Sequence, residues 1–131
     1  MITRARVLLG LILVLASAPS AFSREYPAEV VRILDGDTLE VDLDLGLGLR
    51  KRQLVRLDGI DAPELRGPGR VRGQLAKQAL DAQLSGKRVT VTTRQDALDK
   101  YGRLLGVVKL GSVVINEAMV MQGRAIRREY E

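Results

Sequence analysis

The chain has 131 residues, which is enough for one domain with one hydrophobic core, and it contains neither cysteine nor histidine. The lack of cysteine excludes a disulfide scaffold, and the lack of histidine excludes histidine triads, histidine-liganded zinc sites and histidine general bases. Any catalysis must therefore come from carboxylates, arginines, lysines, tyrosines or a hard metal ion.

The first 23 residues have the composition of a secretory signal peptide. Arg4 and Arg6 precede an apolar run over residues 7–16, and mostly small residues follow up to Ser23. The run is shorter than the about 20 residues that span a bilayer, and an uncleaved anchor is the alternative. We expect cleavage after Ser23, a secreted or periplasmic protein, and no stable membrane association afterwards.

The expected mature domain, residues 24–131, is mildly basic. Two of the 21 lysines and arginines and none of the 16 acids lie in the leader, so the domain carries 19 basic and 16 acidic residues, a net charge of +3. This excess is compatible with a polyanionic substrate without identifying one.

Three strands are predicted in the first half of the domain. A β-branched run covers residues 29–34, and the Asp35-Gly36 pair that follows it indicates a turn. From 38 to 45, leucine and valine alternate with polar or acidic side chains, as in a half-buried strand. Glycines then mark a hairpin loop, and residues 53–60 return as the third strand.

The second half of the domain adds two helices and two strands. Apolar side chains recur at helical spacing over residues 73–84 and 114–122, and a glycine follows each segment. Between the helices, residues 88–93 and 103–110 alternate as strands. Five strands in this order predict an α+β fold, a five-stranded OB-type Greek-key barrel with two packed helices; a small α+β roll is the alternative.

The hairpin register predicts that two aspartates meet. We pair Leu39 with Leu57 because both side chains then face the core. This register places Asp37 opposite Gly59, one diagonal step from Asp61 and about 7–8 Å from it between α-carbons. Two carboxylates at that separation can share one cation, and without a cation they repel each other.

The identity of the cation follows from the available ligands. Each acid alone is readily explained as a turn or capping residue, but the converging pair of aspartates beside Glu64 favours a site. An oxygen-only ligand set suits calcium or magnesium. Calcium is plentiful outside the cell, so the predicted export favours calcium as the bound ion.

Arg56 and Arg103 are the candidate phosphate-binding residues. Arg56 lies within the third strand and Arg103 at the mouth of a later one, and a planar guanidinium donates two parallel hydrogen bonds to phosphate oxygens. The same register places Glu40 opposite Arg56, so a cross-strand ion pair is the alternative. Strict alternation also puts Arg56 on the opposite face from the two aspartates.

Four blocks of residues occur in a specific order over residues 28–125: Asp35-Gly36-Asp37-Thr38, then Arg56 with Gly59-Ile60-Asp61-Ala62-Pro63-Glu64, then Asp99-Lys100-Tyr101-Gly102-Arg103, then Asn116-Glu117-Ala118 with Gln122-Gly123. Together they resemble the thermonuclease (staphylococcal-nuclease-like) family. Each block alone is weak, but the four in this order are highly specific.

The resemblance implies a five-stranded OB barrel and a metal site with its attacking water. Asp37, Asp61 and the backbone carbonyl of Ala62 would bind calcium. Relatives often carry threonine at that third position, but a carbonyl ligand does not depend on the side chain. Glu64 would position or deprotonate the water.

The resemblance also implies how substrate is held. Arg56 and Arg103 would hold the scissile phosphate, while Lys100 and Tyr101 would flank the phosphate of the bound nucleotide. Residues 116–117 look structural and stay outside the predicted site.

The implied activity is an exported calcium-dependent nuclease that hydrolyses the phosphodiester bonds of DNA and RNA and leaves 3′-phosphate and 5′-hydroxyl ends. We expect a monomer that prefers single strands. The alternatives are a catalytically weak OB-type module that binds single-stranded nucleic acid and a structural calcium-binding barrel. The complete set of predicted catalytic and metal-binding residues, and only three tyrosines beyond the leader, argue against the binding module.

Relatives often add a third helix after the barrel. None is expected in the eight residues that follow Gly123, where Tyr130 is the one aromatic residue.

Overall fold

The computed structural model describes residues 23–94 and 98–129 of the chain. Nearly all of the predicted leader and Tyr130 lie outside the described residues, so leader cleavage and export stay predictions. Within the described ranges, no helix is long and apolar enough to cross a membrane.

The described residues form eight strands and two helices, in the order β1 (Arg24–Ile33), β2 (Thr38–Gly46), β3 (Leu49–Leu57), β4 (Ile60–Asp61), α1 (Arg70–Leu84), β5 (Arg88–Thr93), β6 (Arg103–Leu110), β7 (Val113–Val114), α2 (Ile115–Met121) and β8 (Ile126–Arg127). The long strands follow one another in the sheet as β3, β2, β1, β5 and β6. A parallel pairing of β3 with β6 closes the ring, and the other long-strand pairs are antiparallel. The predicted five-stranded barrel with two helices is confirmed, and the open roll is excluded.

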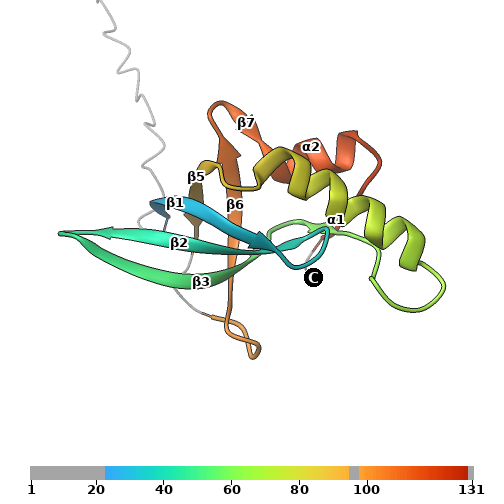
Figure 1. Cartoon of the computed structure of the whole chain (residues 1–131), viewed down its shortest axis with the longest axis horizontal. Helices are drawn as coiled ribbons and strands as arrows, with labels where there is room; N and C mark the ends of the chain where they lie inside the picture. The colour runs from blue at the N-terminus through green and yellow to red at the C-terminus, as the bar shows by residue number, and fades with distance from the viewer. Residues whose placement is uncertain (1–22, 95–97, 130–131) are drawn as a thin grey trace, which may run out of the picture.

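The barrel interior is apolar, and α1 packs against it. Leu39 on β2 and Val55 on β3 are completely buried, as their alternating pattern requires. On α1, Ala76, Leu80 and Leu84 recur every four residues, so they form one stripe, and all three are completely buried. Burial of each leucine stabilises the fold by about 1.5–3 kcal/mol. Figure 1 shows α1 lying along one side of the barrel with α2 behind it.

The register of the β2–β3 hairpin differs by two residues from the prediction: Leu39 faces Val55, not Leu57. A shift by two residues keeps every side chain on its own face, so the hydrophobic pattern accepts both registers. The turn decides between them. Leu47 and Gly48 have φ angles of 56° and 77°, so both are left-handed and the hairpin closes with a two-residue turn.

Several element boundaries also differ from the prediction. β1 begins at Arg24 rather than at residue 29. The third predicted strand is two strands, because Gly59 adopts a left-handed conformation with φ 76° and turns the chain between β3 and β4. α1 begins at Arg70, one turn before the predicted start.

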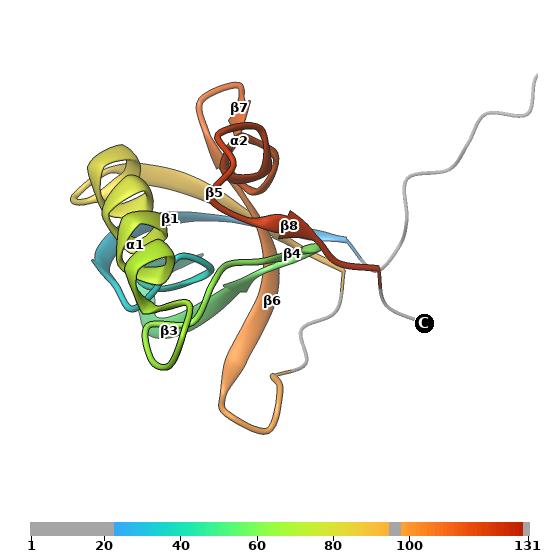
Figure 2. The same ribbon diagram turned by 90° about the vertical axis from the view of Figure 1, so that its right-hand side faces the viewer.

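The strand β8 is an element that the sequence pattern does not predict. It pairs antiparallel with β4, with Asp61 facing Ile126 and Ile60 facing Arg127. Figure 2 shows β8 running alongside β4 near the C-terminal end of the chain. The segment after Gly123 therefore lies against the strand that carries Asp61.

Candidate active site

The turn between β1 and β2 is pressed against α1 and against the segment after β4. A Cβ atom on Gly36 would lie 2.6 Å from Ala76 Cβ and 2.7 Å from Ala62 Cβ, so this position accepts only glycine unless its neighbours move. The N–H of Ala62 donates to Asp37 Oδ2 at 2.9 Å. Asp35 Oδ1 accepts the Asp37 N–H at 2.9 Å. Close packing and hydrogen bonds thus hold Asp37 beside Ala62.

Arg56 joins the two aspartates that were predicted to bind metal. Its Nη2 lies 3.4 Å from Asp37 Oδ2 and forms a second ion pair with Asp61 Oδ1. Its Nη1 donates to the carbonyl oxygens of Leu57 and Ile60, both at 2.8 Å. Because Arg56 is only 8% exposed, its charge is buried and matched. We call Asp37, Arg56 and Asp61 the carboxylate–guanidinium cluster.

Two predictions about Arg56 are wrong. Strict alternation placed it on the opposite face from the aspartates, but the turn at left-handed Gly59 interrupts the alternation between β3 and β4, and the Arg56 side chain contacts Asp61. The predicted register paired Arg56 with Glu40, but the two-residue shift separates them. Glu40 instead pairs with Arg32 at 3.4 Å and with Arg52 at 3.5 Å.

The electrostatics of Asp37 show that its negative charge is costly. Burial raises the pKa of Asp37 to about 6, with further raising by the hydrogen bond and charge of Asp35, against lowering by the Ala62 N–H and by Arg56. The side chain of Asp61 is 40% exposed and that of Asp37 only 12%. Asp37 is therefore the buried carboxylate of the pair and Asp61 the solvent-facing one. A cation bound by both would lower the energetic cost of the buried charge.

The donor set fits a hard, partly hydrated cation. Among the described residues, no group of three or more acidic, histidine or cysteine side chains could hold a metal ion. Two carboxylates would therefore be completed by backbone carbonyl oxygen and water, which calcium accepts. Asp61 and Ala62 line a groove of about 350 Å³, which has room for such water. The convergence of Asp37 and Asp61, predicted from the sequence, is present, although Arg56 mediates it.

Glu64 follows β4 by three residues and is exposed. A Cβ atom on Gly73 would lie 2.2 Å from the Glu64 carbonyl oxygen, so the first turns of α1 fit tightly against the Glu64 backbone. Among the described residues, the Glu64 side chain has no hydrogen-bond or ion-pair partner. A fixed backbone with an unpaired carboxylate suits a residue that acts on water.

Arg103, Lys100 and Tyr101 form a second group in the loop before β6, which we call the 98–103 loop. Asp99 Oδ1 accepts the N–H groups of Tyr101 and Arg103 at 2.9 Å each, and Asp99 Oδ2 accepts Arg103 Nε at 2.8 Å. Lys100 Nζ and Arg103 Cζ lie 5.0 Å and 5.2 Å from the centre of the Tyr101 ring. The predicted substrate-binding residues therefore share one loop.

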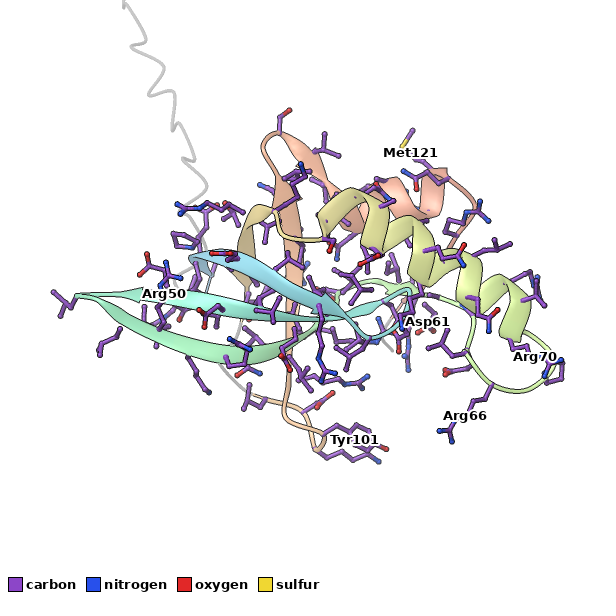
Figure 3. The ribbon with its side chains drawn as sticks, in the orientation of Figure 1. Arg50, Asp61, Arg66, Arg70, Tyr101 and Met121 are labelled. Atoms are coloured by element: carbon purple, nitrogen blue, oxygen red, sulfur yellow. The ribbon has the colours of Figure 1, made fainter. Side chains whose placement is uncertain are left out.

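The parallel pairing of β3 with β6 connects the two groups. Leu54 faces Arg103 and Arg56 faces Leu105. Arg103 and Arg56 thus lie on the same side of neighbouring strands, offset by two residues or about 7 Å along the strand. In Figure 3, Tyr101 lies apart from Asp61, on the loop below the barrel. The two arginines thus face the same side of the barrel, and each has its own partners.

Comparison with known proteins shows the family of this chain. The family model described as "Staphylococcal nuclease homologue" matches residues 54–131. This chain belongs to the staphylococcal nuclease family. The chain is 32% identical over 117 residues to a thermonuclease of Staphylococcus hyicus, which covers 87% of this chain and 66% of that protein. Its identity to an uncharacterized endonuclease of Escherichia coli is 40% over 97 residues, which covers 73% of this chain and 57% of that protein.

A third relative is a micrococcal nuclease of Shigella flexneri, 37% identical over 115 residues that cover 81% of this chain and 60% of the relative. The chain thus spans about three fifths of the length of these three relatives. The resemblance to the thermonuclease pattern is therefore confirmed at the level of the family.

Two residues of the candidate site were missed from the sequence. Asp99 organises the 98–103 loop, and its signal was its position four residues before Arg103. Arg128 Nη1 lies 3.3 Å from Asp61 Oδ1. No local signal pointed to Arg128, because only the pairing of β8 with β4 carries it to Asp61.

Residues 116 and 117 have structural contacts. Asn116 is 3% exposed; its Oδ1 accepts the Val108 N–H at 2.9 Å, and its Nδ2 donates to the Asp58 and Gly106 carbonyls at 2.8 Å and 3.2 Å. Glu117 accepts two hydrogen bonds from Arg127 at 3.0 Å and 2.6 Å. Asn116 therefore ties α2 to the middle of β6 and to the turn after β3, and Glu117 ties α2 to β8.

Proposed function

We propose that the chain is a calcium-dependent nuclease that hydrolyses phosphodiester bonds of DNA and RNA. The observation that carries this proposal is the convergence of Asp37 and Asp61 on the buried guanidinium of Arg56. The relatives' names, which include thermonuclease, micrococcal nuclease and endonuclease, support it. So does the position of Arg103, on the same side of the neighbouring strand.

The metal site would consist of Asp37, Asp61 and the Ala62 carbonyl. When bound, calcium would neutralise charge on the substrate phosphate. The protein's own part is to hold the two carboxylates in place before metal arrives. The Ala62 N–H and Arg56 do so for Asp37, and Arg56 and Arg128 do so for Asp61. Such preorganisation lowers the cost of binding the cation.

Two guanidiniums would bind the phosphate that is attacked. Arg56 presents Nη2 at the cluster, while its Nη1 stays bound to two carbonyls. Asp99 holds Arg103 through Nε, and among the described residues the terminal nitrogens of Arg103 have no hydrogen-bond partner. Those nitrogens can meet two phosphate oxygens as a fork. Charge that builds on the phosphate oxygens in the transition state is thereby stabilised.

Glu64 would align the attacking water and accept its proton. The water oxygen forms a bond to phosphorus, and one water proton passes to the Glu64 carboxylate. The bond from phosphorus to the 5′ oxygen breaks, and the 5′ oxygen leaves with the electron pair and takes up a proton from solvent water. The products are a 3′-phosphate and a 5′-hydroxyl end. Because water is the nucleophile, the 2′-hydroxyl of RNA has no part in the step, so DNA is cut as well.

The broader setting is also part of the proposal. The leader-like residues 1–23 support export to the periplasm or the medium, where calcium is abundant. A monomer acting on single strands is proposed because one exposed tyrosine loop beside one cluster suits a single bound strand.

The test is a nuclease assay on purified protein with labelled DNA and RNA. We expect cutting in millimolar calcium, little in magnesium and none after chelation. End-labelling should reveal 3′-phosphates, and 5′-phosphates would contradict the proposed bond cleavage. A protein that binds single strands in calcium but leaves them intact would be the binding module instead.

A further inference from the structure

Several arginines of the described surface have an acidic partner. Ion pairs join Arg32 to Glu40, Arg50 to Asp42, Arg52 to Glu40 and Asp42, Arg103 to Asp99, Arg127 to Glu117 and Arg128 to Asp61. In the described part of the chain, six arginine side chains have neither an ion pair nor a hydrogen bond: Arg66, Arg70, Arg72, Arg88, Arg94 and Arg124. Arg88 and Arg94 lie at the two ends of the β5 region, and the other four, Arg66, Arg70, Arg72 and Arg124, are what we call the unpaired arginine set.

The unpaired arginine set adjoins the candidate active site. Arg66 lies in the loop after Glu64, Arg70 and Arg72 lie in the first turn of α1, and Arg124 precedes β8. Arg72 and Arg124 line the same groove of about 350 Å³ as Asp61. In Figure 3, Arg70 lies to the right of Asp61, Arg66 lies below it, and Tyr101 lies below it and further to the left.

Fold stability does not explain positive charge at this position. The first turn of α1 contains no acidic residue, and no side chain caps it. The N-terminal end of a helix carries partial positive charge, so a cation there is unfavourable. Arg70 and Arg72 are therefore placed where they destabilise the helix, and a polyanion bound nearby would offset that cost.

The groove that contains Arg72 and Arg124 also has an apolar wall. Pro63 and Ile126 line it together with the two arginines, and Ile126 is 70% exposed. An apolar wall beside cations suits a nucleotide, whose base packs against the wall while its phosphate meets the guanidinium. The groove also includes Asp61, so a strand lying in it would be continuous with the proposed cleavage site.

We propose that the unpaired arginine set is a second nucleic-acid-binding surface, which holds the phosphates of the substrate strand on the α1 side of the cleavage site. The proposal rests on the proposed nuclease function and extends it. The 98–103 loop then binds the strand on one side of the scissile phosphate, and the arginine set binds it on the other. Short substrates cannot reach both sides, so the surface should act on long strands only.

The experiment compares Arg66→Gln/Arg70→Gln/Arg72→Gln with a matched control, Arg32→Gln/Arg50→Gln/Arg52→Gln. Both variants lose three positive charges, but the control removes paired arginines of the β1–β3 strands; Arg50 lies far from Asp61 in Figure 3. Arg124→Gln, a single change inside the groove, is the second test variant. Thermal unfolding of each variant verifies that it is folded before kinetics are measured.

The readouts are kcat/KM on a trinucleotide and on a 20-nucleotide DNA strand in calcium, and the salt dependence of binding a cleavage-resistant 20-mer. We expect the triple variant to lose about tenfold or more on the 20-mer and less than about twofold on the trinucleotide. The slope of log K against log salt should fall by about 2, since each lost phosphate contact on a single strand contributes about 0.7. Arg124→Gln should have the same selectivity with a smaller effect, and the control should change little.

Equal losses on both substrates, or equal losses in the control, would overturn the proposal. So would loss of binding to vesicles containing phosphatidylglycerol with unchanged 20-mer cleavage, because the surface would then serve an anionic membrane. If the parent cuts neither substrate in calcium, the nuclease function fails instead. Binding of the 20-mer by the triple variant and the control still tests the surface in that case.

Discussion

The carboxylate–guanidinium cluster and the 98–103 loop present their arginines in opposite ways. Arg56 is 8% exposed and bound by two carbonyls and two carboxylates from three elements. The Arg103 side chain is 28% exposed, and one carboxylate four residues away holds it. Long-range packing builds the first arrangement, whereas local hydrogen bonds build the second.

The difference between the two arginines predicts that they contribute differently to stability and to activity. A buried guanidinium with four partners is preorganised, but its removal leaves other charges unpaired. A half-exposed one held by a local carboxylate can adjust to substrate, and its loss costs the fold little. Stability and activity should therefore be coupled at Arg56 and separable at Arg103.

The largest expected effect is a loss of kcat without a loss of stability. Glu64→Gln keeps the size of an exposed side chain that has no partner among the described residues, so folding should be unchanged. The kcat should fall by about 10²–10⁴-fold, because the proton acceptor is lost. Steady-state kinetics and thermal unfolding measure both quantities. Cleavage at the parental rate would remove Glu64 from the proposed mechanism.

Alanine variants of Arg56 and Arg103 test this predicted difference directly. Arg56→Ala leaves Asp37 buried without its cation and frees two carbonyls, so the free energy of unfolding should fall by about 3–5 kcal/mol. Arg103→Ala breaks one exposed pair and should cost less than about 1 kcal/mol. Urea unfolding without metal measures the difference. Equal losses of stability would show that the two arginines are held alike.

Asp37→Asn tests the cost of the buried carboxylate. The folded-state pKa of about 6 lies above the ordinary 3.8, so the metal-free parent loses stability as pH rises from about 4 to about 6. Asparagine removes this loss and keeps an oxygen for the Ala62 N–H. The variant should be more stable than the parent at pH 7 by about 1–3 kcal/mol and equal to it near pH 4.

Calcium supplies the control for that measurement. Added calcium should raise the unfolding temperature of the parent and leave Asp37→Asn nearly unchanged, since only the parent keeps both carboxylates. An equal response in the two proteins would contradict the assignment of Asp37 as a ligand.

The smallest expected effect is on the 98–103 loop. Asp99→Ala removes three local hydrogen bonds, but all of them lie at the surface, so stability should fall by less than about 1 kcal/mol. KM should rise several-fold because Arg103 and Tyr101 lose their common anchor. A fall in kcat with no change in KM would mean that the loop acts on the transition state only.

The sequence by itself determined the elements and the residue set. Period-two alternation identified β2, and four-residue spacing identified α1, because these patterns depend on local geometry. Block order indicated the family and predicted its site residues, and the absence of histidine and cysteine limited the candidate metal ligands to oxygen. None of these inferences needs to know which strand lies beside which.

Only the tertiary structure decided how the site residues meet. The hydrophobic pattern allowed two hairpin registers, and the left-handed Leu47-Gly48 turn selected one. The burial of Arg56 between two aspartates required the reversal at Gly59, and the contact of Arg128 with Asp61 required β8 to pair with β4. Contacts between residues distant in sequence arise from how the strands pack, and a local pattern of apolar and polar residues carries no information about that packing.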